Sequence, residues 1–159
     1  MPGHQIEYNE GMYADFVDPF YLIRLKRGEE VIRTLASWAG QAGIPGGMLS
    51  GLGAMKEVTL GYFDDTKREY RKWEFKDPVE ILSLSGGISI LHDKPYIHLH
   101  AVIGDAEGRA WGGHLFQGII TATGEIYVLP ARRKIARVPD SEGPFNLLDL
   151  PTFPFKTHA

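Results

Sequence analysis

The 159-residue sequence contains no cysteine. That absence excludes a disulfide framework and a thiolate nucleophile, and it restricts any metal site to nitrogen and oxygen ligands. No stretch approaches the ~20 consecutive apolar residues that a membrane span needs. The first residues, MPGHQIEYNEG, also lack the basic flank and the apolar run of a signal peptide. We therefore expect a cytoplasmic protein with no membrane partner.

An excess of basic charge is missing too. The formal net charge is −3 and the pI is about 6.1, so the whole chain has no electrostatic attraction to nucleic acid. Basic side chains gather locally near the C-terminus, at Arg132, Arg133, Lys134 and Arg137. This run could contact DNA, or it could form a solvated strand and linker, which is the more usual role of such a run.

The length and the 43% content of hydrophobic residues suit one domain with a substantial core. The stretch 20–26 alternates like a strand, and the apolar spacing of 31–41 predicts a helix that begins after two acidic residues. Further strands are expected at 48–52, 57–63, 69–75, 79–91, 96–104, 110–115, 118–123, 125–129 and 134–138. Their short connections predict a meander, and we find no internal repeat and no linker between domains.

A predicted β-hairpin from Tyr96 to Leu115, YIHLHAVIGDAEGRAWGGHL, carries three of the six histidines. Because successive side chains of a strand alternate between its faces, His98 and His100 lie on the same face. The turn Asp105-Ala106-Glu107-Gly108 reads as a type I turn closed by a glycine bulge. Such a loop pairs residue 105 with residue 109 and fixes the register of both strands.

Counting back from that turn predicts three pairs across the hairpin, which are His100 with His114, Leu99 with Leu115 and Ile103 with Trp111. The imidazoles of His98, His100 and His114 then share one face. Opposed side chains start about 5 Å apart and diagonal ones about 7 to 8 Å apart, so three rings can reach one ion. The sequence therefore predicts a three-histidine metal site, although a single strand histidine is more often hydrogen-bonded or simply exposed.

Three imidazole ligands would leave one coordination position for water, a substrate or another side chain, whereas structural zinc sites normally have four protein ligands. Imidazole suits zinc, and also copper, nickel or iron. A metal-bound water can ionise near pH 7 and act as a nucleophile. Side chains that could support the ligands or move a proton, but that could equally be structural or solvated, are Glu80, Asp105, Glu107, Glu125, Tyr96 and Tyr127.

Five stretches together resemble the prokaryotic branch of the plants-and-prokaryotes-conserved (PPC) domain, over about residues 20–140. They are LIRLKRGEEVIRTL, SGLGA, VEILSLSGGIS, HLHAVIGDAEGRAWGGHL and GEIYVL. The resemblance implies one domain of the α/β class, α+β type, with a mainly antiparallel, strongly bent sheet and one principal packed helix. It also implies a homotrimer and a zinc ion bound by His98, His100 and His114. Residues 1–19 then form an N-terminal segment and residues 141–159 a C-terminal tail.

Plant members of this family combine the domain with AT-hook motifs, short Arg-Gly-Arg-Pro elements that bind the DNA minor groove. This sequence contains no such element. Our leading hypothesis is a trimeric metal-binding module that regulates or senses a small ligand. The alternatives are a zinc-dependent hydrolase or lyase acting on a small metabolite, and a regulator that binds DNA directly through Arg132, Arg133 and Lys134. The sequence carries no cofactor fingerprint that would identify a substrate.

Overall fold

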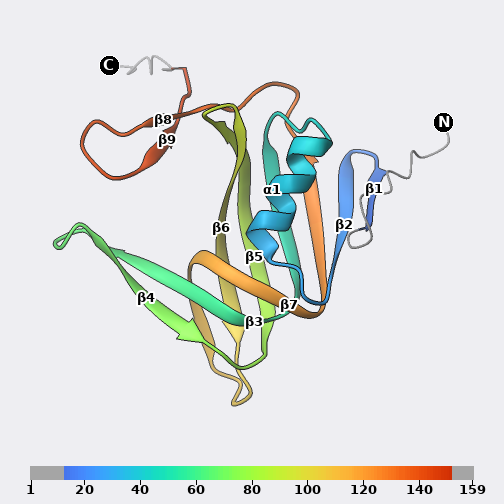
Figure 1. Ribbon diagram of the computed structural model, residues 1–159, viewed down its shortest axis with the longest axis vertical. Helices are drawn as coiled ribbons and strands as arrows, with labels where there is room; N and C mark the ends of the chain where they lie inside the picture. Colours follow the sequence, from blue (N-terminus) through green and yellow to red (C-terminus); the bar gives the residue numbers. More distant parts are fainter. Residues whose placement is uncertain (1–12, 152–159) are drawn as a thin grey trace, which may run out of the picture.

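The computed structural model describes residues 13–151 (Figure 1). Its elements in chain order are β1 (Tyr13–Val17), β2 (Phe20–Lys26), α1 (Val31–Gln41), β3 (Gly47–Asp64), β4 (Glu69–Phe75), β5 (Val79–Leu91), β6 (Lys94–Gly104), β7 (Ala110–Pro130), β8 (Arg137–Pro139) and β9 (Asn146–Leu148). The outer parts of the expected N-terminal segment and C-terminal tail, residues 1–12 and 152–159, lie outside the described residues.

Seven strands form one antiparallel sheet in the order β1-β2-β7-β6-β5-β3-β4, and β3 also pairs with β7. This extra pairing closes β3, β5, β6 and β7 into a ring, so the sheet is strongly bent. The helix α1 packs beside β6 and β7 (Figure 1). The expected α+β class, with a mainly antiparallel sheet and one helix, is confirmed. The predicted meander of four or more strands is wrong, because the longest run of consecutive neighbouring strands is β5, β6 and β7, and only the pairs β1–β2 and β3–β4 follow one another elsewhere.

The structure corrects the expected number of strands. The segments 48–52 and 57–63 belong to the single strand β3, and 110–115, 118–123 and 125–129 belong to β7. Glycines bend these strands instead of ending them. The register of β3 shifts between Gly51 and Gly53, and a Cβ on Gly53 would lie 2.2 Å from the carbonyl oxygen of Thr123 in β7. Glycine is therefore required where the two backbones approach most closely.

The chain has two short strand pairs at its ends. Strand β1 was not predicted from the sequence and pairs with β2. The single strand expected at 134–138 is instead a hairpin of β8 and β9, which pair from Arg137–Leu148 to Pro139–Asn146. An isolated bridge between Ile90 and Ala136 ties this hairpin to the end of β5.

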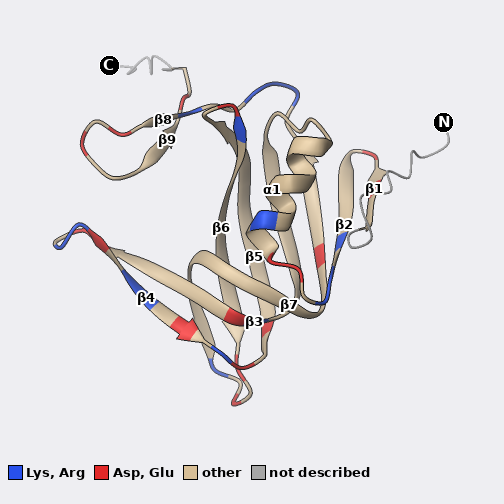
Figure 2. Ribbon diagram, viewed as in Figure 1, with Lys and Arg blue, Asp and Glu red and all other residues tan. Residues whose placement is uncertain are grey.

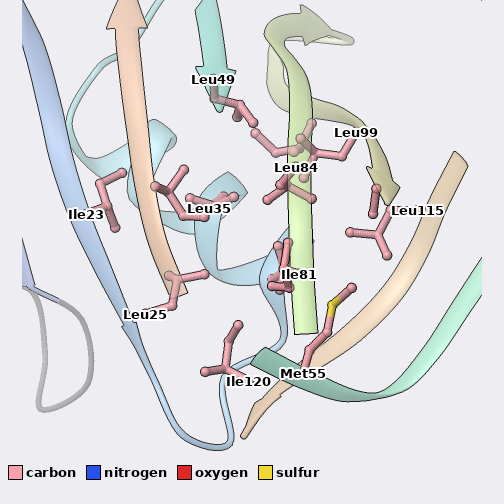
Figure 3. Packing of buried hydrophobic residues seen from close by; sticks show 14 of the residues in the cluster. Ile23, Leu25, Leu35, Leu49, Met55, Ile81, Leu84, Leu99, Leu115 and Ile120 are labelled. Atoms are coloured by element: carbon pink, nitrogen blue, oxygen red, sulfur yellow. The ribbon is translucent and has the colours of Figure 1, made fainter. Parts of the chain in front are cut away.

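The core lies between α1 and the bent sheet. The Glu30 carboxylate caps the helix by accepting hydrogen bonds from the backbone N–H groups of Ile32 and Arg33. Trp38 of the helix is buried. Figure 3 shows Leu35 from the helix gathered with apolar side chains from the surrounding strands. No helix in the described part of the chain is both long and apolar enough to cross a membrane.

The core also determines which face of β6 is free for function. Ile97, Leu99, Ala101 and Ile103 are buried in the core. The residues between them, including His98 and His100, therefore point away from it.

Candidate metal centre

The turn between β6 and β7 has the predicted geometry. Asp105 N–H donates to the carbonyl oxygen of Arg109 over 3.0 Å, and Gly108 N–H donates to that of Asp105 over 3.0 Å. Gly108 has a φ of 75°, which favours glycine. The Asp105 carboxylate also accepts hydrogen bonds from the backbone N–H groups of Glu107 and Arg109. One side chain therefore fixes the closure from which the strand register follows.

The register confirms two of the three predicted pairs. His100 pairs with His114, and Ile103 pairs with Trp111. The expected pairing of Leu99 with Leu115 is wrong, because the β6–β7 ladder ends at the two histidines. Leu115 pairs instead with Leu60 of β3, since β7 bends away from β6 at this point. His114 thus lies where β7 passes from one neighbouring strand to the other.

The three imidazoles form one cluster. One ring nitrogen from each of His98, His100 and His114 lies within 4.8 Å of the other two, and this is the group of metal-ligating side chains found within residues 13–151. The ring centroids are 5.0 to 5.5 Å apart. Nitrogens around a tetrahedral zinc lie about 3.4 Å from each other. Side-chain rotations that move each ring nitrogen by about 1 Å would therefore bring the three atoms to this spacing.

Burial favours the neutral, metal-binding form of two of these rings. Desolvation, with a smaller effect of the neighbouring histidines, lowers the pKa of His114 to about 4. Desolvation also lowers the pKa of His98, and the charge of Arg137 adds to this shift. The Nδ1 atom of His114 is buried and has no hydrogen-bond partner among the described residues. A neutral imidazole with an unsatisfied buried nitrogen fits a metal ligand.

Aromatic side chains line one side of the cluster. The rings of Tyr70 from β4 and Phe116 from β7 lie 5.5 and 4.7 Å from that of His114. Burial raises the pKa of Tyr70, and the nearby phenol of Tyr96 raises it further. Lys72 Nζ lies 4.2 Å from the Phe116 ring. His114 therefore has a phenol ring and a phenyl ring as neighbours, and a cation lies on the phenyl ring.

Arg137 is the residue that sequence reasoning missed at this site. It was assigned to the basic run near the C-terminus, but its Nη2 lies 3.4 Å from His98 Nδ1. Its Nε donates to Ser89 Oγ over 2.7 Å, and its Nη1 donates to the carbonyl oxygen of Asn146. The guanidinium also lies 4.8 Å from the centre of the Tyr96 ring. No local sequence pattern indicates a contact between residues 39 positions apart.

Of the proposed supporting residues, Tyr96 contacts the guanidinium that also lies next to His98, and two others lie at the hairpin turn. The Asp105 carboxylate accepts hydrogen bonds from Trp111 Nε1 and Arg109 Nε, and these bonds hold its pKa well below the usual range. Glu80 is exposed and pairs with Gly104, about 13 Å along β6 from His100. The Glu107 carboxylate forms an ion pair with Arg109 in the turn. Glu125 lies opposite Arg24 in the β2–β7 ladder, and the ring of Tyr127 packs against that of Phe20.

The residues proposed to contact DNA lie in the segment between β7 and β8, visible as blue ribbon in Figure 2. Arg132 and Arg133 are exposed. Lys134 is also exposed, and its Nζ forms an ion pair with Asp93 over 2.8 Å. These side chains therefore form a small basic surface next to at least one acid.

Solved structures resemble this fold over nearly its whole length. A protein from Bacteroides thetaiotaomicron, provisionally described as DNA-binding, has a TM-score of 0.84 and 27% identity, covering 88% of this chain and 98% of that one. A plant- and prokaryote-conserved protein from Pyrococcus horikoshii has a TM-score of 0.78 and 28% identity, and the match covers 92% of this chain and 100% of that one. A metal-containing protein from Archaeoglobus fulgidus has a TM-score of 0.75 and 31% identity, and the match covers 90% of this chain and 99% of that one.

Sequence comparisons match this chain to part of two longer proteins and to a domain family. Two bifunctional GlmU proteins from Synechococcus strains are 35% and 34% identical to this chain over 123 residues, which is 76% of this chain and 18% of each relative. The chain therefore corresponds to less than a fifth of those proteins. The family model of the Plants and Prokaryotes Conserved domain matches residues 16–131. The chain belongs to the Plants and Prokaryotes Conserved domain family.

Proposed function

We propose that this protein is a metal-binding module that regulates or senses a small ligand, with His98, His100 and His114 as the metal ligands. The observation that carries the proposal is that three ring nitrogens, from the neighbouring strands β6 and β7, lie within 4.8 Å of one another. The unsatisfied, buried Nδ1 of His114 supports it. The metal-containing relative from Archaeoglobus fulgidus, 31% identical, supports it as well.

Zinc is the ion we propose, because three neutral imidazoles suit a tetrahedral ion with one open position. When bound, the ion would act as a Lewis acid for a ligand in that position. Within residues 13–151, no Asp or Glu side chain joins the histidine group. A sensing role fits this arrangement better than acid-base catalysis, which needs a proton-transfer group close to the ligand. We also propose a homotrimer, which the exposed apolar face described below supports.

Elemental analysis of untagged protein, dialysed after loading with zinc, tests the proposal. We expect about one zinc per chain in the wild type and a large loss in His100→Asn. His92→Asn is the matched control, because His92 is exposed in the β5–β6 turn and lies outside the cluster. Wild-type protein that retains no metal, or equal metal in His100→Asn, would overturn the proposal.

A metal-dependent hydrolase or lyase is the second candidate for the same site. The phenol of Tyr70 favours it, since its ring lies 5.5 Å from that of His114 and the hydroxyl group could transfer a proton. Turnover in a broad screen of small metabolites, lost in His100→Asn and reduced in Tyr70→Phe, would support this role. A screen without turnover leaves the sensing role as the better explanation.

Direct DNA binding is the third candidate. It rests on the exposed side chains of Arg132 and Arg133 and on a relative provisionally described as DNA-binding. Gel retardation of a DNA duplex at two salt concentrations tests it, because phosphate contacts weaken steeply with salt. A retarded band that weakens with salt and disappears in the double variant Arg132→Ala, Arg133→Ala would support it, and no retardation at low salt would exclude it.

A further inference from the structure

The guanidinium of Arg137 is a partly buried cation without an acidic partner in the described part of the chain. Its contacts are all to uncharged groups, namely Ser89 Oγ, the carbonyl oxygen of Asn146, His98 Nδ1 and the Tyr96 ring. None of the ion pairs among residues 13–151 involves it. Removing a cation from water without a counter-charge is unfavourable, so an anion would be a favourable additional partner for this group.

Arg137 and a metal ion compete for the same ring of His98. A guanidinium has only N–H donors, and a neutral imidazole has one lone pair on its ring nitrogens, so the contact to His98 Nδ1 uses that lone pair. When a metal takes the lone pair, the other ring nitrogen carries the hydrogen. Arg137 Nη2 then has no acceptor on His98 and becomes a free donor next to the metal ligands.

Two further contacts hold the arginine independently of His98. Its Nε donates to Ser89 Oγ, and its Nη1 donates to the backbone carbonyl oxygen of Asn146. The hairpin that carries it is joined to β5, because Ile90 N–H donates to the carbonyl oxygen of Ile135 over 2.8 Å. The freed donor is therefore held at the site by both the main sheet and the β8–β9 hairpin.

We propose that Arg137 is the second anchor of an anion site, which takes small molecules carrying a carboxylate or phosphate group. One oxygen of the anion occupies the open metal position, and another accepts from the guanidinium. Charge supports this choice of ligand, since a divalent ion, three neutral imidazoles and Arg137 together carry three positive charges. Lys72, next to Phe116, adds another cation nearby. The guanidinium keeps its positive charge at any pH near neutrality, so the donor that it offers to the anion is a charged one. This inference rests on the metal site proposed above.

The test uses full-length protein loaded with cobalt(II), whose visible absorption reports its coordination. Inorganic phosphate and acetate are titrated separately at pH 7.5. In the wild type we expect both probes to change the cobalt bands with saturation. In Arg137→Gln the apparent Kd for the probe should rise about tenfold or more, since a charge-assisted hydrogen bond is lost. Arg133→Gln is the matched control, because it removes the same charge from an exposed arginine and should stay within about twofold.

Cobalt binding itself separates an anion anchor from a structural arginine. Removing Arg137 also removes a competitor for the His98 lone pair and a repelling charge, so Arg137→Gln should bind cobalt at the same stoichiometry and at least as tightly. Arg137→Lys keeps the charge but not the contacts to Ser89 and Asn146 that hold the donor in place, and it should fall between wild type and Arg137→Gln in anion affinity. If both variants bind less cobalt than the wild type, the residue is structural and the inference is overturned.

The remaining outcomes distinguish the two proposals. Wild-type protein that takes up no cobalt overturns the metal site, and the anion site with it. Cobalt uptake with bands that neither probe changes leaves the metal site intact and overturns the anion site. The same conclusion follows if Arg137→Gln and wild type titrate with equal Kd.

Discussion

Burial determines the protonation of His98 and His114 more than their charged neighbours do. Desolvation is the largest cause of the lowered pKa at both residues. A cluster of three histidines that stayed protonated near pH 7 would repel a cation. Keeping two of them neutral prepares the site for a metal, at the expense of folded-state stability in acid.

The first prediction concerns the stability of metal-free protein in acid. An unfolded histidine binds a proton near pH 6.5, whereas folded His114 stays neutral until about pH 4. Between these values the unfolded state binds more protons, so the free energy of unfolding decreases as pH falls. Because the ring is only half-buried, we expect His114 to account for about 1–2 kcal/mol of this decrease.

Urea denaturation from pH 7 to pH 4, with chelator present, measures this effect. In His114→Gln the decrease in the free energy of unfolding should be smaller than in the wild type by that amount. His92→Gln is the control and should follow the wild type, since its side chain is exposed. An equal decrease in His114→Gln and wild type would contradict the prediction.

The second prediction separates two adjacent glycines beside His114. A Cβ on Gly113 would lie 2.7 Å from the carbonyl oxygen of Gly61, whereas one on Gly112 would meet its nearest atom, the carbonyl oxygen of Ala101, at 3.6 Å. Gly113→Ala should therefore lower the free energy of unfolding by about 1–3 kcal/mol, because β7 must move away from β3. Gly112→Ala should change it by no more than about 0.5 kcal/mol. Urea denaturation of both variants at pH 7.5 measures the difference, and equal effects would contradict it.

The residues of the site differ in how far the sequence could predict them. The shared face of His98, His100 and His114 follows from strand alternation and one turn, both of which are local patterns. Arg137 could not be found in this way, because it reaches His98 only through the hairpin that folds back onto β5. Its position in a basic run instead suggested a role at the surface.

At the level of elements, the predicted strands differ from the observed ones at glycine residues, because β3 and β7 are continuous where shorter strands were expected. Gly53 and Gly124 fall between the ranges expected as separate strands, but each lies inside a continuous strand where one backbone passes close to another. Gly124, for example, pairs with Leu25 on one side and with Gly53 on the other. A sequence pattern cannot distinguish a glycine that ends a strand from one that lets two strands approach, because the difference depends on which strand lies opposite.

The third prediction concerns the β6–β7 turn. Asp105→Ala removes the acceptor for the backbone N–H groups of Glu107 and Arg109 and for the Trp111 indole N–H. Because this turn sets the register of His100 and His114, the variant should lower both the thermal midpoint and the cobalt affinity. Asp105→Asn keeps one oxygen acceptor and should show smaller losses.

Thermal denaturation and cobalt titration of the same samples measure both effects. Glu107→Ala is the control, because it removes only an exposed ion pair with Arg109 and should change neither quantity appreciably. Full cobalt affinity in an Asp105→Ala protein with a lowered thermal midpoint would show that the turn contributes to stability without positioning the histidines.

At the level of the whole molecule, one face of the sheet is left apolar and exposed. It lies on β2, β7 and β3, on the side opposite the core, and consists of Leu22, Met48, Leu52, Tyr127 and Leu129. The register makes the face continuous, since Tyr127 pairs with Leu22 and Leu129 pairs with Met48. Monomeric proteins rarely expose a large continuous apolar patch, so this face suits contact with another subunit.

The last prediction tests the proposed homotrimer at this face. Light scattering of wild-type protein should give a mass three times the 17.7 kDa of one chain. Leu129→Lys places a charge on β7, the middle strand of the apolar face, where burial against a second subunit would be unfavourable, so its mass should fall toward that of one chain. Leu147→Lys introduces the same charge at an exposed leucine of β9 and should leave the mass unchanged. A wild-type monomer would exclude the trimer, and a trimeric Leu129→Lys would mean that the subunits meet through another surface.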